Sequence, residues 1–300
     1  MIAIPHILFC ESPIENNKVD PDFEEEYAAA KRDGFGVLFY NYDNFTIDNI
    51  ISKIKPANTI TNTIYRGWML TVQQYTELYN QLLSKNYRLI NTPLQYKNCH
   101  YLPDSLRFIE EYTPRTIYQE YNGETSIDYL IEKTKIFNGS PVIIKDYVKS
   151  EKHNWDTACF VKDSSDVKAL KQTIHNFIAL RDKYLNVGIV VREFLPLKHL
   201  TIHSKSGMPL TEEYRLFFYQ HELLGVFDYW EEGNYIPERP DTTVFEEIAK
   251  QIDSVFFSMD IALQKNGEYI IIELGDGQVA GLPDRLNRTL FYNALNNLLS

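Results

Sequence analysis

Two lysines near the middle of the chain have the type and spacing to hold a polyphosphate. Lys145 and Lys149 belong to the largely apolar run 141–149, which reads as a β-strand. Every second side chain of a strand points to the same face, so both ammonium groups and Tyr147 would share one face. Like charges that close require an anion between them. The alternative is an edge strand whose lysines stay in water and discourage pairing, and the residues alone do not decide between the two.

A second candidate lies where the apolar strand 187–194 ends in Arg192, Glu193 and Phe194, shortly before Pro196. Proline lacks an N–H group and ends the ladder. A backbone segment released there could offer an N–H and a C=O to the edge of an adenine base. A salt bridge at the strand end explains the same residues without a ligand, and the local sequence by itself favours that simpler interpretation.

Arg215 stands among aromatic residues in a predicted hairpin over 214–229. A guanidinium in such surroundings requires a fixed anion, either a carboxylate or a phosphate. If the turn is His221-Glu222, Arg215 lies opposite Asp228, and an ion pair between them is the structural alternative. The turn contains neither Gly nor Asn, so the sequence leaves this register open.

The hairpin around Asn266-Gly267 carries two carboxylates that could share a metal ion. Asn-Gly predicts a type I′ turn, and counting outward from it places Asp260 opposite Glu273, with Cβ atoms ~4.5–5.5 Å apart. Such a pair among apolar neighbours either takes up a proton or binds a cation, and magnesium accepts one or two carboxylates together with phosphates. Asp276, just beyond the strand, is a third candidate ligand. The simple alternative is a carboxylate that reaches solvent at the strand end.

The elements that must position these residues change character along the chain. Over the N-terminal third, short apolar runs such as 36–40 alternate with amphipathic helical patterns, one of them opened by a capping box at Thr71 and Gln74. This alternation predicts a small α/β unit with a parallel sheet.

Beyond Pro103, predicted helices, single strands and two hairpins indicate an α+β arrangement. The helices are expected at 105–112 and 126–137, from Val167, and after Thr243, where Glu246 would complete a second capping box.

Composition limits the classes of function. The 300 residues are 44% hydrophobic and 24% charged, as in ordinary globular proteins, and the net charge of -11 disfavours nonspecific nucleic-acid binding. Cys10, Cys99 and Cys159 form no CxxC pair, so neither a disulfide framework nor a zinc site is indicated. We find no signal peptide and no apolar run of the ~20 residues that cross a bilayer, and we therefore expect a cytoplasmic protein without a membrane partner.

Other nucleotide-binding and catalytic motifs are missing. The segment after Glu273 contains three glycines with the wrong spacing and too little following chain for a Rossmann unit. There is no Walker motif, no nucleophile elbow and no HExxH motif.

The lysine strand, the Arg-Glu strand end, the hairpin arginine and the paired carboxylates follow one another in an order that resembles the ATP-grasp superfamily. More closely, the chain resembles the third family of the clade named for one arginine and two lysines, over nearly its whole length. The segments that carry the resemblance are Tyr65-Arg66-Gly67-Trp68-Met69, Tyr112-Thr113-Pro114-Arg115-Thr116, Lys145-Asp146-Tyr147-Val148-Lys149-Ser150, Val191-Arg192-Glu193-Phe194, Glu213-Tyr214-Arg215 and Ile272-Glu273-Leu274-Gly275-Asp276-Gly277.

The resemblance implies an ATP-grasp fold that binds ATP and Mg²⁺. A small N-terminal α/β domain over 1–104 would precede an ATP-grasp domain over 105–300, whose subdomains, 105–197 and 198–300, clamp the nucleotide. The implied residues are Lys145 and Lys149 for the α- and β-phosphates, Arg192, Glu193 and Phe194 for adenine, Arg215 for the γ-phosphate, Arg115 as a further basic residue, and Asp260 and Glu273 for magnesium.

One departure concerns the metal. Many ATP-grasp enzymes have Glu-x-Asn there, whereas this chain has Gly275 at the asparagine position. Asp276 could substitute for it.

ATP-grasp enzymes typically activate a carboxylate as an acyl phosphate, which an amine or another nucleophile then attacks. Positioning and charge neutralisation are the main physical tasks. The resemblance therefore implies a carboxylate–amine or carboxylate–thiol ligase acting on an amino acid, a peptide or a protein end. The clade also resembles the eukaryotic ATP-grasp chaperone that assembles translation initiation factor 2, so an ATP-binding docking module with a protein partner is the rival. A structural domain without a ligand is a third interpretation, if salt bridges account for every charge.

Overall fold

The computed structural model describes residues 4–42, 51–205, 207–236 and 238–299. It divides into two compact units. The first unit comprises residues 1–99, 200–260 and 274–300, and the second unit comprises residues 100–199 and 261–273. The N-terminal third and most of the C-terminal part of the chain thus belong to one compact unit. The domain boundaries expected at 104 and 197 stay a prediction.

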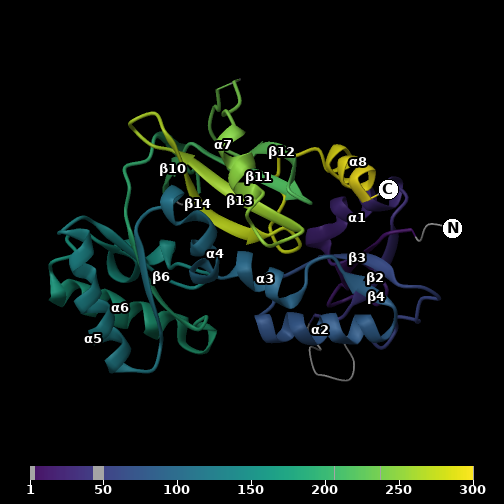
Figure 1. The fold of residues 1–300 in the computed structure, drawn as a ribbon, viewed down its shortest axis with the longest axis horizontal. Coiled ribbons are helices and arrows are strands. Elements are labelled where there is room, and N and C mark those ends of the chain that lie inside the picture. Colours follow the sequence, from purple (N-terminus) through teal and green to yellow (C-terminus); the bar gives the residue numbers. More distant parts are fainter. Residues whose placement is uncertain (1–3, 43–50, 206, 237, 300) are drawn as a thin grey trace. The chain divides into compact units, whose positions relative to one another are not determined.

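The N-terminal part of the first unit is a parallel sheet of order β2-β1-β3-β4 (Figure 1). This confirms the α/β arrangement predicted from the alternating pattern. The Thr71–Gln74 capping box is also confirmed, because the Thr71 hydroxyl accepts from Gln74 N and the Gln74 side chain accepts from Thr71 N. The elements are β1 (His6–Cys10), α1 (Glu24–Arg32), β2 (Gly36–Tyr40), β3 (Thr61–Arg66), α2 (Val72–Ser84), β4 (Tyr87–Leu89) and α3 (Pro93–His100).

The C-terminal part supplies a second sheet, of order β12-β11-β13-β14, and a two-stranded sheet of β10 and β9. The residues of β13 and β14 are divided between the two units, at Asp260 and Leu274. The elements are β9 (His199–Ile202), β10 (Pro209–Thr211), β11 (Glu213–Tyr219), β12 (Glu222–Asp228), α7 (Thr243–Ala249), β13 (Phe256–Leu263), β14 (Tyr269–Asp276) and α8 (Arg288–Leu299).

The second predicted capping box was wrong. Helix α7 has Thr242 at its N-cap, and no side chain caps it. The Thr243 hydroxyl donates to Asp241 instead, which removes it from the expected pairing with Glu246.

The register proposed for Arg215 was also wrong. The β11–β12 turn is Gln220-His221, with positive φ at both residues, and it lies one residue earlier than expected. A bulge near Phe217 shifts the pairing again, so Arg215 lies opposite Phe227. The shift lies beside Gly225, and a glycine inside a strand is a local sign of such a bulge that the predicted register did not take into account.

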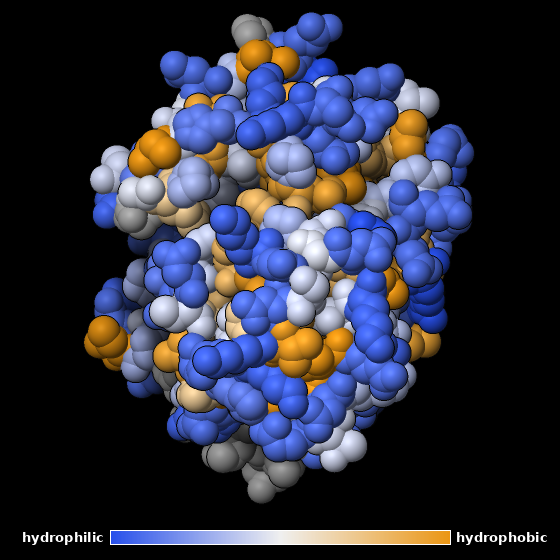
Figure 2. All heavy atoms as spheres, turned by 90° about the vertical axis from the view of Figure 1, so that its left-hand side faces the viewer, coloured by the Kyte–Doolittle hydropathy of each residue, from blue (hydrophilic) through white to orange (hydrophobic). Residues whose placement is uncertain are grey.

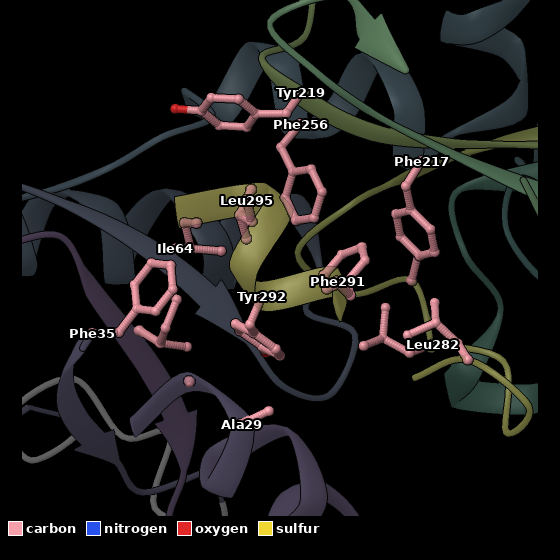
Figure 3. Close-up of a cluster of buried hydrophobic side chains, with 14 of the residues drawn as sticks. Ala29, Phe35, Ile64, Phe217, Tyr219, Phe256, Leu282, Phe291, Tyr292 and Leu295 are labelled. Carbon is pink, nitrogen blue, oxygen red and sulfur yellow. The ribbon is translucent and has the colours of Figure 1, made fainter. Parts of the chain in front are cut away.

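An aromatic cluster joins the two parts of the first unit (Figure 3). Ile64 of β3 and Phe35 belong to the same buried cluster as Phe217 of β11 and Phe256 of β13. Phe291, from α8, contacts the rings of Phe217 and Phe256. Burial of large aromatic side chains is a principal source of stability, which explains why these distant segments form one unit.

Arg66 makes a second connection within this unit. Its side chain is buried and forms a bidentate ion pair with Glu26 of α1, at 2.8 and 2.9 Å. Its Nη1 donates to the carbonyls of Gly277 and Ala280, and Tyr292 of α8 donates to Glu26. The charged groups are therefore satisfied by separate segments of the chain that lie far apart in sequence.

The second unit is built on an antiparallel sheet of order β5-β8-β6-β7. Apolar residues of α5 and α6 belong to its core. The helices expected to end at 112 and 137 do so as 3₁₀ turns that follow α4 and α5. The elements are α4 (Leu102–Ile109), β5 (Thr116–Glu120), α5 (Glu124–Lys133), β6 (Val142–Asp146), β7 (Phe160–Val161), α6 (Val167–Arg181) and β8 (Gly188–Glu193).

Hydrophilic side chains dominate the face of the molecule that Figure 2 presents, and apolar ones are scattered among them. Within the described residues, every helix is too short or too polar to cross a bilayer.

Arg66→Met is expected to destabilise the first unit strongly, because it leaves Glu26 buried without its cation. Breaking a buried ion pair costs about 3–5 kcal/mol, which urea unfolding would measure. The double variant Arg66→Met/Glu26→Gln should recover part of the loss, and Arg88→Met, at an exposed position of β4, should change little. Equal stability of the Arg66 and Arg88 variants would contradict the role of this network.

Candidate functional site

Lys145 lies on β6 and is 6% exposed. Its Nζ is 3.3 Å from Oε2 of Glu273, in the same unit. The strand ends at Asp146, and so the expected single face shared by Lys145, Tyr147 and Lys149 was wrong. Lys149 lies instead in the turn that follows the strand.

The carboxylate of Asp146 shapes this turn. It is fully buried, and its Oδ1 accepts from the main-chain N–H groups of Val148 and Lys149. Its Oδ2 accepts from Arg181 Nε and from the backbone and side chain of Asn186. Every bond of this set would weaken if the charge were removed, so Asp146 is a positioning residue for Lys149.

Positive charge gathers in this part of the second unit, where Lys145 and Arg192 are buried and Lys149 is exposed. Desolvation lowers the pKa of Lys149, and the neighbouring charges of Lys145 and Arg181 lower it further, against the opposing effect of Glu273. Burial also lowers the pKa of Arg192 to about 10, again opposed by Glu273. The charged forms of these groups lack sufficient negative charge around them, which an anionic ligand would provide.

His100 belongs to the same surroundings, although no sequence pattern selects it. Burial and the charge of Lys149 lower the pKa of its imidazole to about 3, so the ring is neutral at physiological pH. A polar residue at the end of a helix has no distinctive spacing, and only the fold brings it near the lysines.

The expected adenine segment is already engaged in hydrogen bonds. Arg192 is 3% exposed; its Nη2 donates to Thr113 and to the Ile271 carbonyl, and its Nε has no partner among the described residues. Glu193 forms a bidentate pair with Arg115, at 2.8 and 2.9 Å. The N–H groups of Glu193 and Phe194 donate to backbone carbonyls, so they are not available to a base in this arrangement.

Arg215 and Asp260 form a bidentate ion pair in the first unit, with both N–O distances at 2.7 Å. The carboxylate expected as the structural alternative is therefore Asp260 rather than Asp228, which pairs with Arg239. Arg215 also donates to the Gly281 carbonyl and lies over the Tyr229 ring, 4.8 Å from its centre. Arg215, predicted to bind phosphate, and Asp260, predicted to bind the metal ion, are thus ion-pair partners.

Asp276, the third expected metal ligand, is fully buried in the first unit. Its Oδ2 accepts from Asn91, and its Oδ1 accepts from the backbone and side chain of Gln278. Burial raises the pKa of this carboxyl to about 6 despite these donors. Both carboxylate oxygens accept hydrogen bonds from within the unit, and a metal ion could bind them only by replacing those hydrogen bonds.

The two carboxylates of Asp260 and Glu273 suit magnesium, which needs few ligands from the protein. Glu273 has a partly exposed side chain, and magnesium accepts one or two carboxylates while phosphates and waters complete its shell. Among the described residues, no group of three or more His, Cys, Asp or Glu side chains gathers around a metal position. The two residues belong to different units, and the sharing of one ion by them stays a prediction.

A family model for an ATP-grasp domain, that of the third family in the clade named for one arginine and two lysines, matches residues 136–295. The chain belongs to this family. The match confirms the resemblance drawn from the lysines, the arginine and the carboxylates, and it begins after Arg115. No curated protein matched the sequence.

Solved structures of ATP-grasp proteins share the fold over nearly the whole chain. A RimK domain ATP-grasp protein from Sphaerobacter thermophilus is 12% identical, with a TM-score of 0.58, and the match covers 97% of this chain and 98% of that one. The ATP-grasp ligase PsnB, complexed with a precursor peptide and AMPPNP, is 12% identical, with a TM-score of 0.59 and coverage of 100% and 99%. D-cycloserine synthetase DcsG is 10% identical, with a TM-score of 0.59 and coverage of 98% and 99%. These likenesses confirm the ATP-grasp fold.

The neutral state of His100 gives a pH prediction. The unfolded imidazole, with a pKa near 6.5, takes up a proton as pH falls, whereas the folded one does not until about pH 3. This contribution to stability is complete above the unfolded pKa and is lost as pH falls below it, by about 2 kcal/mol between pH 7 and pH 5.

Urea unfolding across this pH range should therefore show a shallower pH dependence for His100→Gln than for the parent protein. An imidazole signal of His100 that titrates near its ordinary pKa in the folded protein would contradict the prediction.

Proposed function

We propose that the protein is a Mg-ATP-dependent ligase that joins a carboxylate to an amine, with an amino acid, a peptide or a protein end as substrate. The observation that carries the proposal is the gathering of basic side chains around Glu273 in the second unit: Lys145 is its ion-pair partner, and the charges of Lys149 and Arg192 also interact with it. A nucleotide polyphosphate would supply further negative charge there. Solved structures with the same fold include a ligase and a synthetase.

In the proposed reaction, the substrate carboxylate attacks the γ-phosphorus of ATP, and ADP leaves as the acyl phosphate forms. The amine nitrogen then attacks the acyl carbon, phosphate departs, and the nitrogen loses a proton. Lys145 and Lys149 would neutralise the phosphates, and Arg215 would stabilise the transferred phosphoryl group once Asp260 releases it. Bound magnesium, held by Asp260 and Glu273, would supply further charge neutralisation.

The first test is ADP release from Mg-ATP across a panel of amino acids and short peptides. ADP formation should require both a carboxylate and an amine, and a new amide product should appear in equal amount. Nucleotide binding without turnover, together with a protein partner that purifies with the chain, would favour the docking module instead.

Lys145→Ala is expected to weaken Mg-ADP binding by about tenfold to a hundredfold, since a hydrogen bond to a charged group contributes about 1.5–3 kcal/mol. Calorimetry would measure the affinity, and thermal unfolding would confirm that the variant is folded. The matched control is Lys168→Ala, which removes an exposed lysine from α6 of the same unit. Unchanged affinity in folded Lys145→Ala would exclude its phosphate role.

Glu273→Gln should act in opposite directions with and without the metal. In EDTA, removal of a negative charge beside Lys145 should strengthen ATP binding or leave it unchanged. With magnesium present, loss of a metal ligand should weaken ATP binding by about tenfold, equivalent to about 1.4 kcal/mol. A variant that weakens ATP binding equally under both conditions would show that Glu273 does not hold the metal.

A further inference from the structure

The first unit contains a cavity of about 300 Å³ that the nucleotide-binding residues of the second unit do not line. One wall is the segment that follows β12, with Tyr229, Trp230, Glu231 and Glu232. Another is the segment 281–284, and Arg215 of β11 contributes to a third. This volume is at the small end of ligand pockets and suits a group of amino-acid size.

Three acidic side chains, those of Glu231, Glu232 and Asp284, line this cavity together with the basic side chains of Arg215 and His203, and His203 lies 3.7 Å from Glu232. Glu231 and Asp284 both line the cavity, and the interaction with the Asp284 carboxyl group raises the pKa of Glu231 above its ordinary value. Glu232 accepts from the backbone and hydroxyl of Ser204 and keeps its negative charge. The charge of Arg215 is compensated by its bidentate pair with Asp260. Arg288 lies 3.7 Å from Asp284, and a further cation beside Glu231 would reduce the repulsion between the two carboxyl groups.

The remaining walls suit an organic cation better than a metal ion. The rings of Tyr229 and Trp230 meet edge to face, with centres 4.7 Å apart. Arg215 already covers the Tyr229 ring, which leaves the Trp230 indole as the aromatic face for an ammonium group; neither ring provides a ligand for a hard metal ion. Trp230 also has a buried Nε1–H without an acceptor among the described residues, and a buried donor left unpaired is costly. A carbonyl or carboxylate oxygen on the ligand would satisfy it.

We propose that this cavity binds the amine substrate of the ligase, as a group of amino-acid size that carries an ammonium and a neighbouring carbonyl or carboxylate. Glu231 and Asp284 would receive the ammonium, Tyr229 and Trp230 would cover its apolar part, and the Trp230 indole would donate to its oxygen. The assignment rests on the proposed ligase function for its role in turnover. The binding itself can be measured without turnover.

The test uses the full chain labelled with ¹⁵N at its three tryptophan indoles, with the Trp230 signal assigned by Trp230→Phe. The probes are L-alaninamide, which has the ammonium and the carbonyl, and N-acetyl-L-alaninamide, which keeps the carbonyl and lacks the charge. L-Alaninamide should shift the Trp230 signal in a saturable way. The acetylated compound should bind weaker by about tenfold or more, equivalent to about 1.4 kcal/mol.

The double variant Glu231→Gln/Asp284→Asn should weaken L-alaninamide binding by about tenfold while Mg-ATP binding is retained. The matched control, Glu247→Gln, removes one exposed carboxylate of α7 that does not line the cavity. Equal shifts by both probes, or by neither, would overturn the proposal even if ADP forms with other substrates. A selective shift without any ADP formation would support the cavity and count against the ligase.

Discussion

The architecture of the first unit depends on one buried guanidinium. Arg66 ends β3, yet its bonding partners come from α1 and from the segment 277–280, while Tyr292 of α8 completes the shell around Glu26. A buried charge persists only when its hydrogen bonds are complete, so these segments are constrained together. The aromatic cluster in Figure 3 provides the apolar burial, whereas the Arg66 network defines how the segments are arranged around it.

A common pattern of compensation appears in the two units. Arg215 is held by Asp260, and Lys145 by Glu273; in each pair, a residue implied for phosphate binding contacts one implied for magnesium. An anion alone would have to compete with the carboxylate, and a cation alone would have to compete with the basic group. A ligand that carries both a phosphate and a metal ion would give each basic side chain a new anion and each carboxylate a new cation. Little favourable electrostatic energy would then be lost when the present ion pairs separate. Under the proposed function, this charge exchange would favour binding of the metal and the nucleotide together.

The ATP-grasp fold could be predicted from the sequence, because its marks are residue types in a fixed order along the chain. Local periodicity correctly placed the parallel sheet, the capping box at Thr71 and the strands of the β11–β12 hairpin, though not its register. Periodicity failed for Lys149, because the strand ends at Asp146, whose carboxylate accepts hydrogen bonds from two main-chain N–H groups of the following turn. The same carboxylate is held by Arg181 and Asn186, which are distant in the sequence. Periodicity also missed His100, whose pKa is set by burial rather than by any neighbour in sequence.

If the cavity binds a substrate as proposed, the Arg66 network would connect the N-terminal sheet to its wall without direct contact with the substrate. The carbonyls of Gly277 and Ala280 are fixed by Arg66, and the chain then enters the cavity wall at Gly281, where it accepts from Arg215. Leu282 lines the cavity and also belongs to the aromatic cluster. A change that breaks the Arg66 hydrogen bonds would remove two contacts that hold the segment leading to Asp284. Under the proposed function, substrate selectivity would then depend on the packing of the first unit as well as on the residues that line its cavity.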